Sequence, residues 1–232
     1  MKTSIEYRDL GLFDYKKAWE YQENIFRERV NLKFEKRKNP ELESHNLDDV
    51  LLFVEHPHVY TLGKSGDRTN LLITDEFLKK IDASYYHIDR GGDITYHGPG
   101  QIVGYPIFDL EHFNIHLKQY VFGLEQTIIN FLEDLGIKGE RLNGATGVWL
   151  DPGTSKARKI CAIGVKGSRH ITMHGFAFNV NTNIDYFSYI NPCGFIDKGV
   201  TSLEKELGIT QDFEEIKLRL KAKIIEYFTS LA

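Results

Sequence analysis

Three segments of the chain carry apolar residues at the spacing of an amphipathic helix. In residues 13–30, apolar and aromatic side chains recur at helical intervals opposite a charged face. Residues 120–135 repeat this pattern and are followed by Gly136, a residue common just beyond helix C-termini. Residues 212–231 form the third such segment. We therefore expect one helix near each end of the chain and one near its middle.

Shorter apolar runs predict strands. Residues 50–54 are continuously apolar with β-branched ends, which is typical of a buried strand, and residues 102–110 alternate enough to form another. A block rich in strand-forming residues follows, in which turn residues separate 147–150, 159–166 and 171–180. These three segments predict an antiparallel meander.

A polar stretch at residues 33–49 contains Pro40 and charges of both signs, and it predicts a long exposed loop. Too little chain precedes it for a linker between two domains. The whole chain has 232 residues, of which 41% are hydrophobic, so it can bury a sizeable core. We expect one domain of mixed α and β structure over residues 1–232.

Composition and charge exclude several classes of protein. The formal net charge of −4 disfavours a general nucleic-acid binder, which needs an excess of lysine and arginine. No segment approaches the run of about 20 apolar residues that a membrane span requires, and the start of the chain does not have the pattern of a signal peptide. Only two cysteines, Cys161 and Cys193, are present, as expected in a reducing compartment. A cytoplasmic protein is the expectation, and a single bridge between the two cysteines is a less favoured alternative.

The stretch RGGDITYHGPGQ at residues 90–101 holds four glycines and a proline between two strand-like segments. Glycine tolerates positive φ and lets a ligand approach the main chain, so this stretch predicts two tight bends flanking an extended run at residues 94–96. A pair of ordinary surface turns is the alternative. Arg90, Tyr96 and His97 within eight residues favour a loop that carries function.

The two cysteines have different sequence surroundings. Cys193 follows Asn191 and Pro192 and precedes Gly194, a turn-forming context that presents a sulfur at a loop tip. Cys161 lies in an alternating strand segment, where a cysteine is most often a small buried hydrophobe. Cys193 is therefore the candidate nucleophile.

A thiol with a pKa near 8.5 is mostly protonated at neutral pH, so a reactive cysteine needs a cationic neighbour. Lys159 is the candidate. If residues 159–166 form a regular strand, Lys159 shares a face with Cys161 and Ile163, and its ammonium lies against an apolar surface, which lowers a lysine pKa. A surface lysine at a strand end is the alternative, and the sequence alone slightly favours it. His56 and His58 are followed by no ligand cluster at metal spacing, so no metal site is expected.

Residues 90–101, followed by VGYPI at 103–107, resemble the signature of the octanoyltransferases of the lipoate pathway. These enzymes move an octanoyl group from acyl carrier protein to a lysine of lipoyl domains. Residues 158–165, 172–181 and 190–195 resemble further motifs of the family, in the same order. Several motifs in order over most of a chain are far more specific than any one of them.

The resemblance implies an α/β (α+β) domain of the biotin/lipoate protein ligase-like type, a mixed β-sheet with flanking α-helices. It implies that Cys193 accepts the acyl group and that Lys159 pairs with it. It also makes residues 55–63 a wall of the substrate pocket. His97 and His174 could each orient the thioester or satisfy a hydrogen bond in the core, and a site role is favoured for His97 only. The substrate-binding residues that the resemblance implies are Arg90, Gly91, Gly92, Asp93, Ile94, Thr95, Tyr96, His97, Ala162, Ile163, Gly164, Gly175, Phe176 and Ala177.

The implied reaction is a two-step acyl transfer that needs no cofactor. The Cys193 thiolate takes the acyl group of octanoyl-acyl carrier protein, and a lysine amine of a lipoyl domain then takes it as an amide. The expected acceptors are the lipoyl domains of 2-oxoacid dehydrogenase complexes and the glycine cleavage H protein. Basic residues near the motifs could form a surface that attracts the acidic carrier protein, and scattered solvated charges are an equally good interpretation.

Three other functions remain open at this point. A lipoate or biotin ligase shares the fold type but activates its acid with ATP. An octanoyl amidotransferase also uses a cysteine and moves the group between two lipoyl-type carriers. A scaffold that binds acyl carrier protein without catalysis is the alternative that is not an enzyme.

Overall fold

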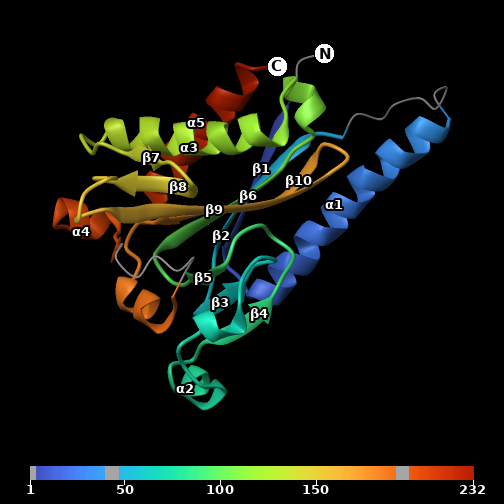
Figure 1. The fold of residues 1–232 in the computed structure, drawn as a ribbon. Helices are drawn as coiled ribbons and strands as arrows, with labels where there is room; N and C mark the ends of the chain where they lie inside the picture. The colour runs from blue at the N-terminus through green and yellow to red at the C-terminus, as the bar shows by residue number, and fades with distance from the viewer. Residues whose placement is uncertain (1–3, 40–46, 192–198) are drawn as a thin grey trace.

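A mixed sheet of eight strands forms the centre of the computed structural model, which describes residues 4–39, 47–191 and 199–232 (Figure 1). Its order is β1 (Ile5–Leu12), β2 (Asp49–Glu55), β6 (Gln101–Ile107), β10 (Ile171–Asn179), β9 (Arg158–Ser168), β8 (Ala145–Leu150) and β7 (Glu140–Leu142), and β11 (Gly199–Val200) pairs with β9. β1 runs parallel to β2 and β11 parallel to β9, whereas the other neighbours are antiparallel. The predicted meander is confirmed as β8, β9 and β10.

Helices cover both faces of this sheet. α1 (Tyr15–Lys38) packs on one face, and α3 (Leu117–Glu133) and α5 (Phe213–Thr229) pack on the other, so all three predicted helices are present (Figure 1). Phe228 of α5 is fully buried and contacts the rings of Phe108 and Tyr120. Burial of such an aromatic side chain contributes about 1.5–3 kcal/mol, so this layer is a main source of stability.

A smaller sheet lies beside the first and has the order β4 (Ser84–His87), β3 (Val59–Leu62), β5 (Ile94–His97). Figure 1 shows it below the main sheet, next to the short helix α2 (Asp75–Lys80). The remaining elements are α4 (Leu203–Leu207) and the 3₁₀ helices η1 (Arg68–Asn70), η2 (Leu110–Phe113) and η3 (Ile184–Tyr189). The glycine-rich stretch contains β5 and therefore belongs to the small sheet. Its first residues contact β9 of the main sheet through a hydrogen bond from Gly91 N to Val165 O.

The prediction of an exposed loop over residues 33–49 is wrong for its first part. Residues 33–38 continue α1, and residues 40–46 lie outside the described chain. Lysine, arginine and glutamate lose little rotamer freedom in a helix, which supports its polar extension. Lys33 also anchors this turn, because its Nζ lies 2.6 Å from Glu111 Oε2 and pairs with Asp109 as well.

Strands β6 and β10 approach so closely at Gly175 that a side chain there has no room. A Cβ at Gly175 would overlap Gly104 O and lie 2.6 Å from Pro106 Cδ. We expect Gly175→Ala to destabilise the fold by about 2–3 kcal/mol, the cost of overpacking a rigid core. Thermal unfolding measures the effect, with Gly199→Ala as control because its Cβ would lie 3.4 Å from its nearest neighbour. Equal melting temperatures for the two variants would contradict this interpretation of the β6–β10 contact.

Candidate active site

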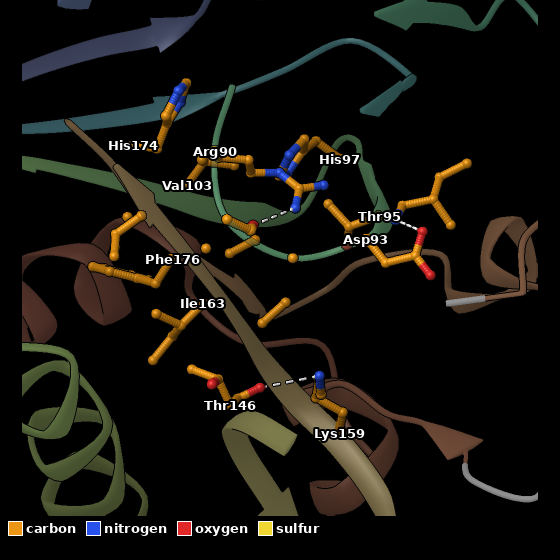
Figure 2. Close-up of a pocket in the computed structure, with 18 of the residues that line it drawn as sticks. Arg90, Asp93, Thr95, His97, Val103, Thr146, Lys159, Ile163, His174 and Phe176 are labelled. Atoms are coloured by element: carbon orange, nitrogen blue, oxygen red, sulfur yellow. Dashed lines mark hydrogen bonds between the residues drawn. The ribbon is translucent and has the colours of Figure 1, made fainter. Parts of the chain in front are cut away.

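A cavity of about 510 Å³ lies where the glycine-rich stretch faces β9 and β10 (Figure 2). This volume is within the range of about 300–1,000 Å³ that small-molecule sites occupy. Of the residues expected to bind substrate, those that line it are Arg90, Gly91, Gly92, Asp93, Ile94, Thr95, His97, Ala162, Ile163, Gly164, Gly175, Phe176 and Ala177. Three segments that are far apart in the sequence therefore meet at one cavity.

Glycines allow the loop of residues 90–93 to lie directly on β9. Gly91 N donates to Val165 O at 2.9 Å, and a Cβ at Gly164 would lie only 2.8 Å from Gly91 O. Gly92 has φ +89° and Gly100 has φ +77°, so both predicted bends use left-handed glycine backbone. The run between them forms β5, as the sequence predicted.

The Arg90 side chain is buried and holds this loop to β3. Its Nη2 donates to Thr61 O at 2.7 Å and to Thr61 Oγ1 at 3.0 Å, and Nη1 donates to Gly91 O at 3.1 Å. The cavity lining includes no residue from 55–63, so the expectation that this segment is a pocket wall is wrong. This segment contains β3, which pairs with β5 and binds the Arg90 side chain on the side away from the cavity.

Tyr96 is the one described member of the expected substrate-binding set that is absent from the lining. It is fully buried, its hydroxyl bonds His58 Nδ1 at 2.7 Å, and its ring packs against Tyr186 and Phe187. Tyr96 therefore does not line this cavity, unlike the other expected residues of the loop. Its side chain belongs to the aromatic cluster between the small sheet and η3.

His97 is buried at the cavity and is held by a chain of hydrogen bonds. Its Nδ1 lies 2.8 Å from Gln101 Oε1, Gln101 Nε2 donates to Asn179 Oδ1 at 2.8 Å, and Asn179 Nδ2 donates to Thr201 O at 2.9 Å. Because Gln101 uses its amide oxygen here, His97 donates from Nδ1 and carries a lone pair on Nε2. Burial, and then the nearby His56, lower the pKa of His97 well below its usual value, so it is a neutral acceptor.

His174 also lines the cavity and is nearly fully buried. Its Nε2 lies 3.1 Å from Asp89 Oδ1, and Gln22 Oε1 accepts from its backbone N–H at 3.2 Å. The imidazole holds the pKa of the Asp89 carboxyl well below its usual range, and Lys166 adds to this effect. Burial lowers the pKa of His174 itself.

Burial of His56 makes the stability of the fold depend on pH. It is fully buried, Nδ1 lies 2.7 Å from Phe13 O, Nε2 lies 2.8 Å from Tyr105 Oη, and burial lowers its pKa to about 4. The unfolded chain binds this proton at the ordinary value near 6.5, so stability falls as pH drops from about 6.5 to 4, by about 3 kcal/mol for this group. Urea unfolding across this range should show the slope, reduced in His56→Gln. An unchanged slope in the variant would contradict the assignment.

A break in strand pairing decides where Lys159 and Cys161 lie. The β8–β9 register shifts between the pairs Val148–Cys161 and Trp149–Lys159, so one extra residue interrupts the alternation. Ile160 and Cys161 are both in the core, whereas Lys159 lines the cavity with Ala162. The expectation that Lys159 shares a face with Cys161 is therefore wrong.

Lys159 enters the cavity from the β8 side. Its Nζ donates to Thr146 O at 3.1 Å and lies 4.6 Å from the centre of the Trp149 ring (Figure 2). Cys161 is fully buried in the core, as predicted, and burial raises its thiol pKa, so it is not a ready nucleophile. Cys193 lies outside the described residues. The described chain on either side of it contributes Phe187, Gly199 and Val200 to the lining.

Sequence reasoning missed several lining residues. Gln101 lies in the stretch 90–101 and Asn179 in the motif 172–181, so their position in the sequence is a signal for their amides as partners of His97. Tyr15 of α1 stacks with His97, their ring centres 5.9 Å apart, and no sequence signal placed it there. Only the packing of α1 on the sheet brings it to the cavity.

The predicted basic surface is partly neutralised. Arg158 bonds Glu206 and Asp151, Lys166 pairs with Asp89, and Arg90 is buried. Among the described residues, no group of His, Cys, Asp or Glu side chains is arranged to hold a metal ion. The same part of the chain contains no helix long and apolar enough to cross a membrane.

Comparison with known proteins places this fold and cavity in one family. The family model described as the lipoyl protein ligase A/B catalytic domain matches residues 14–225. An octanoyltransferase from Parabacteroides distasonis is 57% identical over 97% of this chain and 99% of its own, and one from Christiangramia forsetii is 54% identical over 98% and 97%. The crystal structure of lipoate-protein ligase A bound with ATP superposes with TM-score 0.68 at 14% identity, covering 100% of this chain and 85% of the other.

The chain belongs to the lipoyl protein ligase A/B catalytic-domain family, and it has the lipoate and biotin ligase-like fold, a mixed sheet with flanking helices. The identities above 50% over nearly full length are to octanoyltransferases. The protein is accordingly an acyltransferase of the octanoyltransferase group. The expected family and fold class are confirmed.

Proposed function

We propose that this enzyme transfers an octanoyl group from octanoyl-acyl carrier protein to a lysine of a lipoyl domain through a thioacyl intermediate on Cys193. The observation that carries the proposal is the identity of more than half the residues with octanoyltransferases, over nearly the full length of both chains. The cavity supports it, because the motif residues expected to bind the acyl group meet there with Lys159.

In the first step the Cys193 thiolate attacks the thioester carbonyl of the donor. The carbon–sulfur bond to the carrier protein breaks, a new thioester forms on Cys193, and the carrier thiolate leaves and takes up a proton. In the second step the acceptor amine attacks this thioester, an amide forms, and the Cys193 thiolate is released. Lys159 stabilises the thiolate and exchanges the amine proton.

The cavity walls suit an acyl chain. Val103, Ile163, Phe176 and Ala177 give an apolar lining on β6, β9 and β10, whereas Lys159 lies on the β8 side (Figure 2). Neutral His97 offers an acceptor rather than a charge within this lining. The octanoyl tail therefore lies against the β6–β10 wall with its carbonyl toward Lys159.

The partners follow from the same proposal. The donor is octanoyl-acyl carrier protein, and the acceptors are lipoyl domains of 2-oxoacid dehydrogenase complexes and the glycine cleavage H protein. Among the described basic residues near the motifs, Lys64, Lys156 and Arg169 are exposed and can meet an acidic carrier, whereas Arg158 and Lys166 are paired with carboxylates. The cytoplasm is the compartment in which this donor and these acceptors meet.

Donor choice tests the proposal. The purified enzyme is mixed with a lipoyl domain and either octanoyl-acyl carrier protein without ATP, or free octanoate with ATP, or an octanoylated lipoyl-type carrier. We expect octanoyl-lysine to form from the acyl carrier protein donor alone. Product only with octanoate and ATP would instead indicate a ligase, and product only from the lipoyl-type carrier an amidotransferase. Carrier binding without transfer would indicate a scaffold.

A further inference from the structure

Glu125 is a buried carboxylate on α3 that the proposed reaction does not use. Its side chain points from the helix into the sheet, where Oε1 accepts from Gly147 N at 3.0 Å and Oε2 accepts from Arg141 Nε at 2.8 Å. The residue is 8% exposed. Burying a charge is costly unless it is paired and hydrogen-bonded, so its two partners make this position tolerable.

One peptide group joins this carboxylate to Lys159. The N–H that Glu125 accepts belongs to Gly147, and the carbonyl of the same Thr146–Gly147 peptide accepts from Lys159 Nζ at 3.1 Å. The two hydrogen bonds are therefore in series through a single amide. A peptide that donates to a carboxylate at its nitrogen becomes a stronger acceptor at its oxygen, because such bonds polarise one another.

The backbone conformation at Gly147 allows both hydrogen bonds of the Thr146–Gly147 peptide. Gly147 has φ +120°, and a Cβ there would lie 2.5 Å from Cys161 O, so no other residue fits without a shift. The break in β8–β9 pairing occurs beside it and brings Lys159, rather than Cys161, to the cavity. The peptide is thus fixed on one side by Glu125 and on the other by β9.

We propose that Glu125 is a positioning residue for Lys159, acting through the Thr146–Gly147 peptide. This inference rests on the proposed role of Lys159 in acyl transfer. The carboxylate orients the carbonyl that accepts one N–H of the Lys159 ammonium. The Trp149 ring, whose centre lies 4.6 Å from Nζ, stabilises the ammonium in the same position through a cation–π contact. Long lysine side chains have many rotamers, so a fixed acceptor reduces the entropy lost when Lys159 acts.

Glu125→Gln tests the role, because the amide keeps the size of the side chain and removes its charge. We expect the first-order rate of enzyme acylation by octanoyl-acyl carrier protein to fall about tenfold with KM little changed. The reason is that the charge-assisted hydrogen bond from Gly147 N, which orients the acceptor of Lys159, is lost. The matched control is Glu133→Gln, which removes the same charge from an exposed position of the same helix and should leave the rate unchanged.

A double-mutant cycle separates positioning from a general structural effect. In a Lys159→Ala background Glu125→Gln should cause no further loss, because the group it positions is gone. If the two losses multiply, Glu125 acts independently of Lys159 and the inference is overturned. If Lys159→Ala alone keeps the natural rate, the assignment of Lys159 in the proposed function fails first.

A signal from the Gly147 amide tests the link without any assay of activity. A proton donated to a carboxylate resonates downfield, so the Gly147 amide resonance should move upfield in Glu125→Gln and stay in place in Glu133→Gln. A Gly147 resonance that is the same in all three proteins would overturn the proposed hydrogen-bond chain, whatever the rates. Glu125→Asp, which keeps the charge but shortens the reach, should reproduce the slow rate and the shifted resonance.

Discussion

Cys193→Ala should lower octanoyl transfer at least about a thousandfold, because the thioacyl route loses the thiol that takes up the acyl group. Cys161→Ala should keep most of the activity, since Cys161 is fully buried in the core and burial raises its thiol pKa. Steady-state transfer from octanoyl-acyl carrier protein to a lipoyl domain measures both variants.

The comparison between the two cysteines is informative because they are the only two in the chain. A modest loss in Cys161→Ala that follows a lower melting temperature reflects a core defect rather than chemistry. Equal and complete loss from both substitutions, in proteins that remain folded, would contradict the assignment of Cys193 as the sole acyl acceptor.

Lys159→Ala should slow enzyme acylation about a hundredfold, the usual size of a lost proton-transfer group. It should also raise the pH at which acylation reaches half its maximum, because the thiolate loses its cationic neighbour. Rapid-quench acylation measured from pH 6 to 10, about the range in which thiols titrate, tests both effects. Lys118→Ala removes an exposed lysine at the start of α3 that has no part in the proposed site or carrier surface, and it is the control. A pH profile in Lys159→Ala identical to that of the natural enzyme would remove Lys159 from the mechanism.

Much of the fold could be predicted because its hydrophobic pattern is local. The apolar run at 50–54 is the buried β2, and the periodic segments at 13–30, 120–135 and 212–231 match α1, α3 and α5. In each case one face or the whole segment is buried, which gives the sequence a clear period. These elements depend little on distant residues.

Elements with a weaker pattern could not be predicted in this way. β1 is half-buried along most of its length, and β3 and β4 of the small sheet have four residues each, too short to show a period. The helical extension over residues 33–38 is polar, and its ion pairs with Asp109 and Glu111 come from a segment more than seventy residues away. Tertiary contacts, rather than local pattern, decide these cases.

In the candidate site, too, some residues could be predicted from local sequence, whereas others are positioned by tertiary contacts. Glycine content indicated a functional loop at 90–101, and thirteen of the fourteen substrate residues that the family resemblance implied line the cavity, Tyr96 being the exception. The face on which Lys159 lies could not be predicted, because one extra residue in β9 reverses the alternation. Glu125 and Tyr15 could not be predicted either, since each lies on a helix packed on the sheet: Tyr15 lines the cavity, and Glu125 contacts the Gly147 amide behind it.

Intact-protein mass tests the central claim most directly. The natural chain and Cys193→Ala are each mixed with octanoyl-acyl carrier protein, without ATP and without acceptor, and their masses are recorded over time. The proposed mechanism predicts one covalent octanoyl group on the natural chain, none on Cys193→Ala, and loss of the group when a lipoyl domain is added. An octanoyl group on Cys193→Ala, or transfer to the lipoyl domain by the natural chain with no adduct at any time, would contradict it.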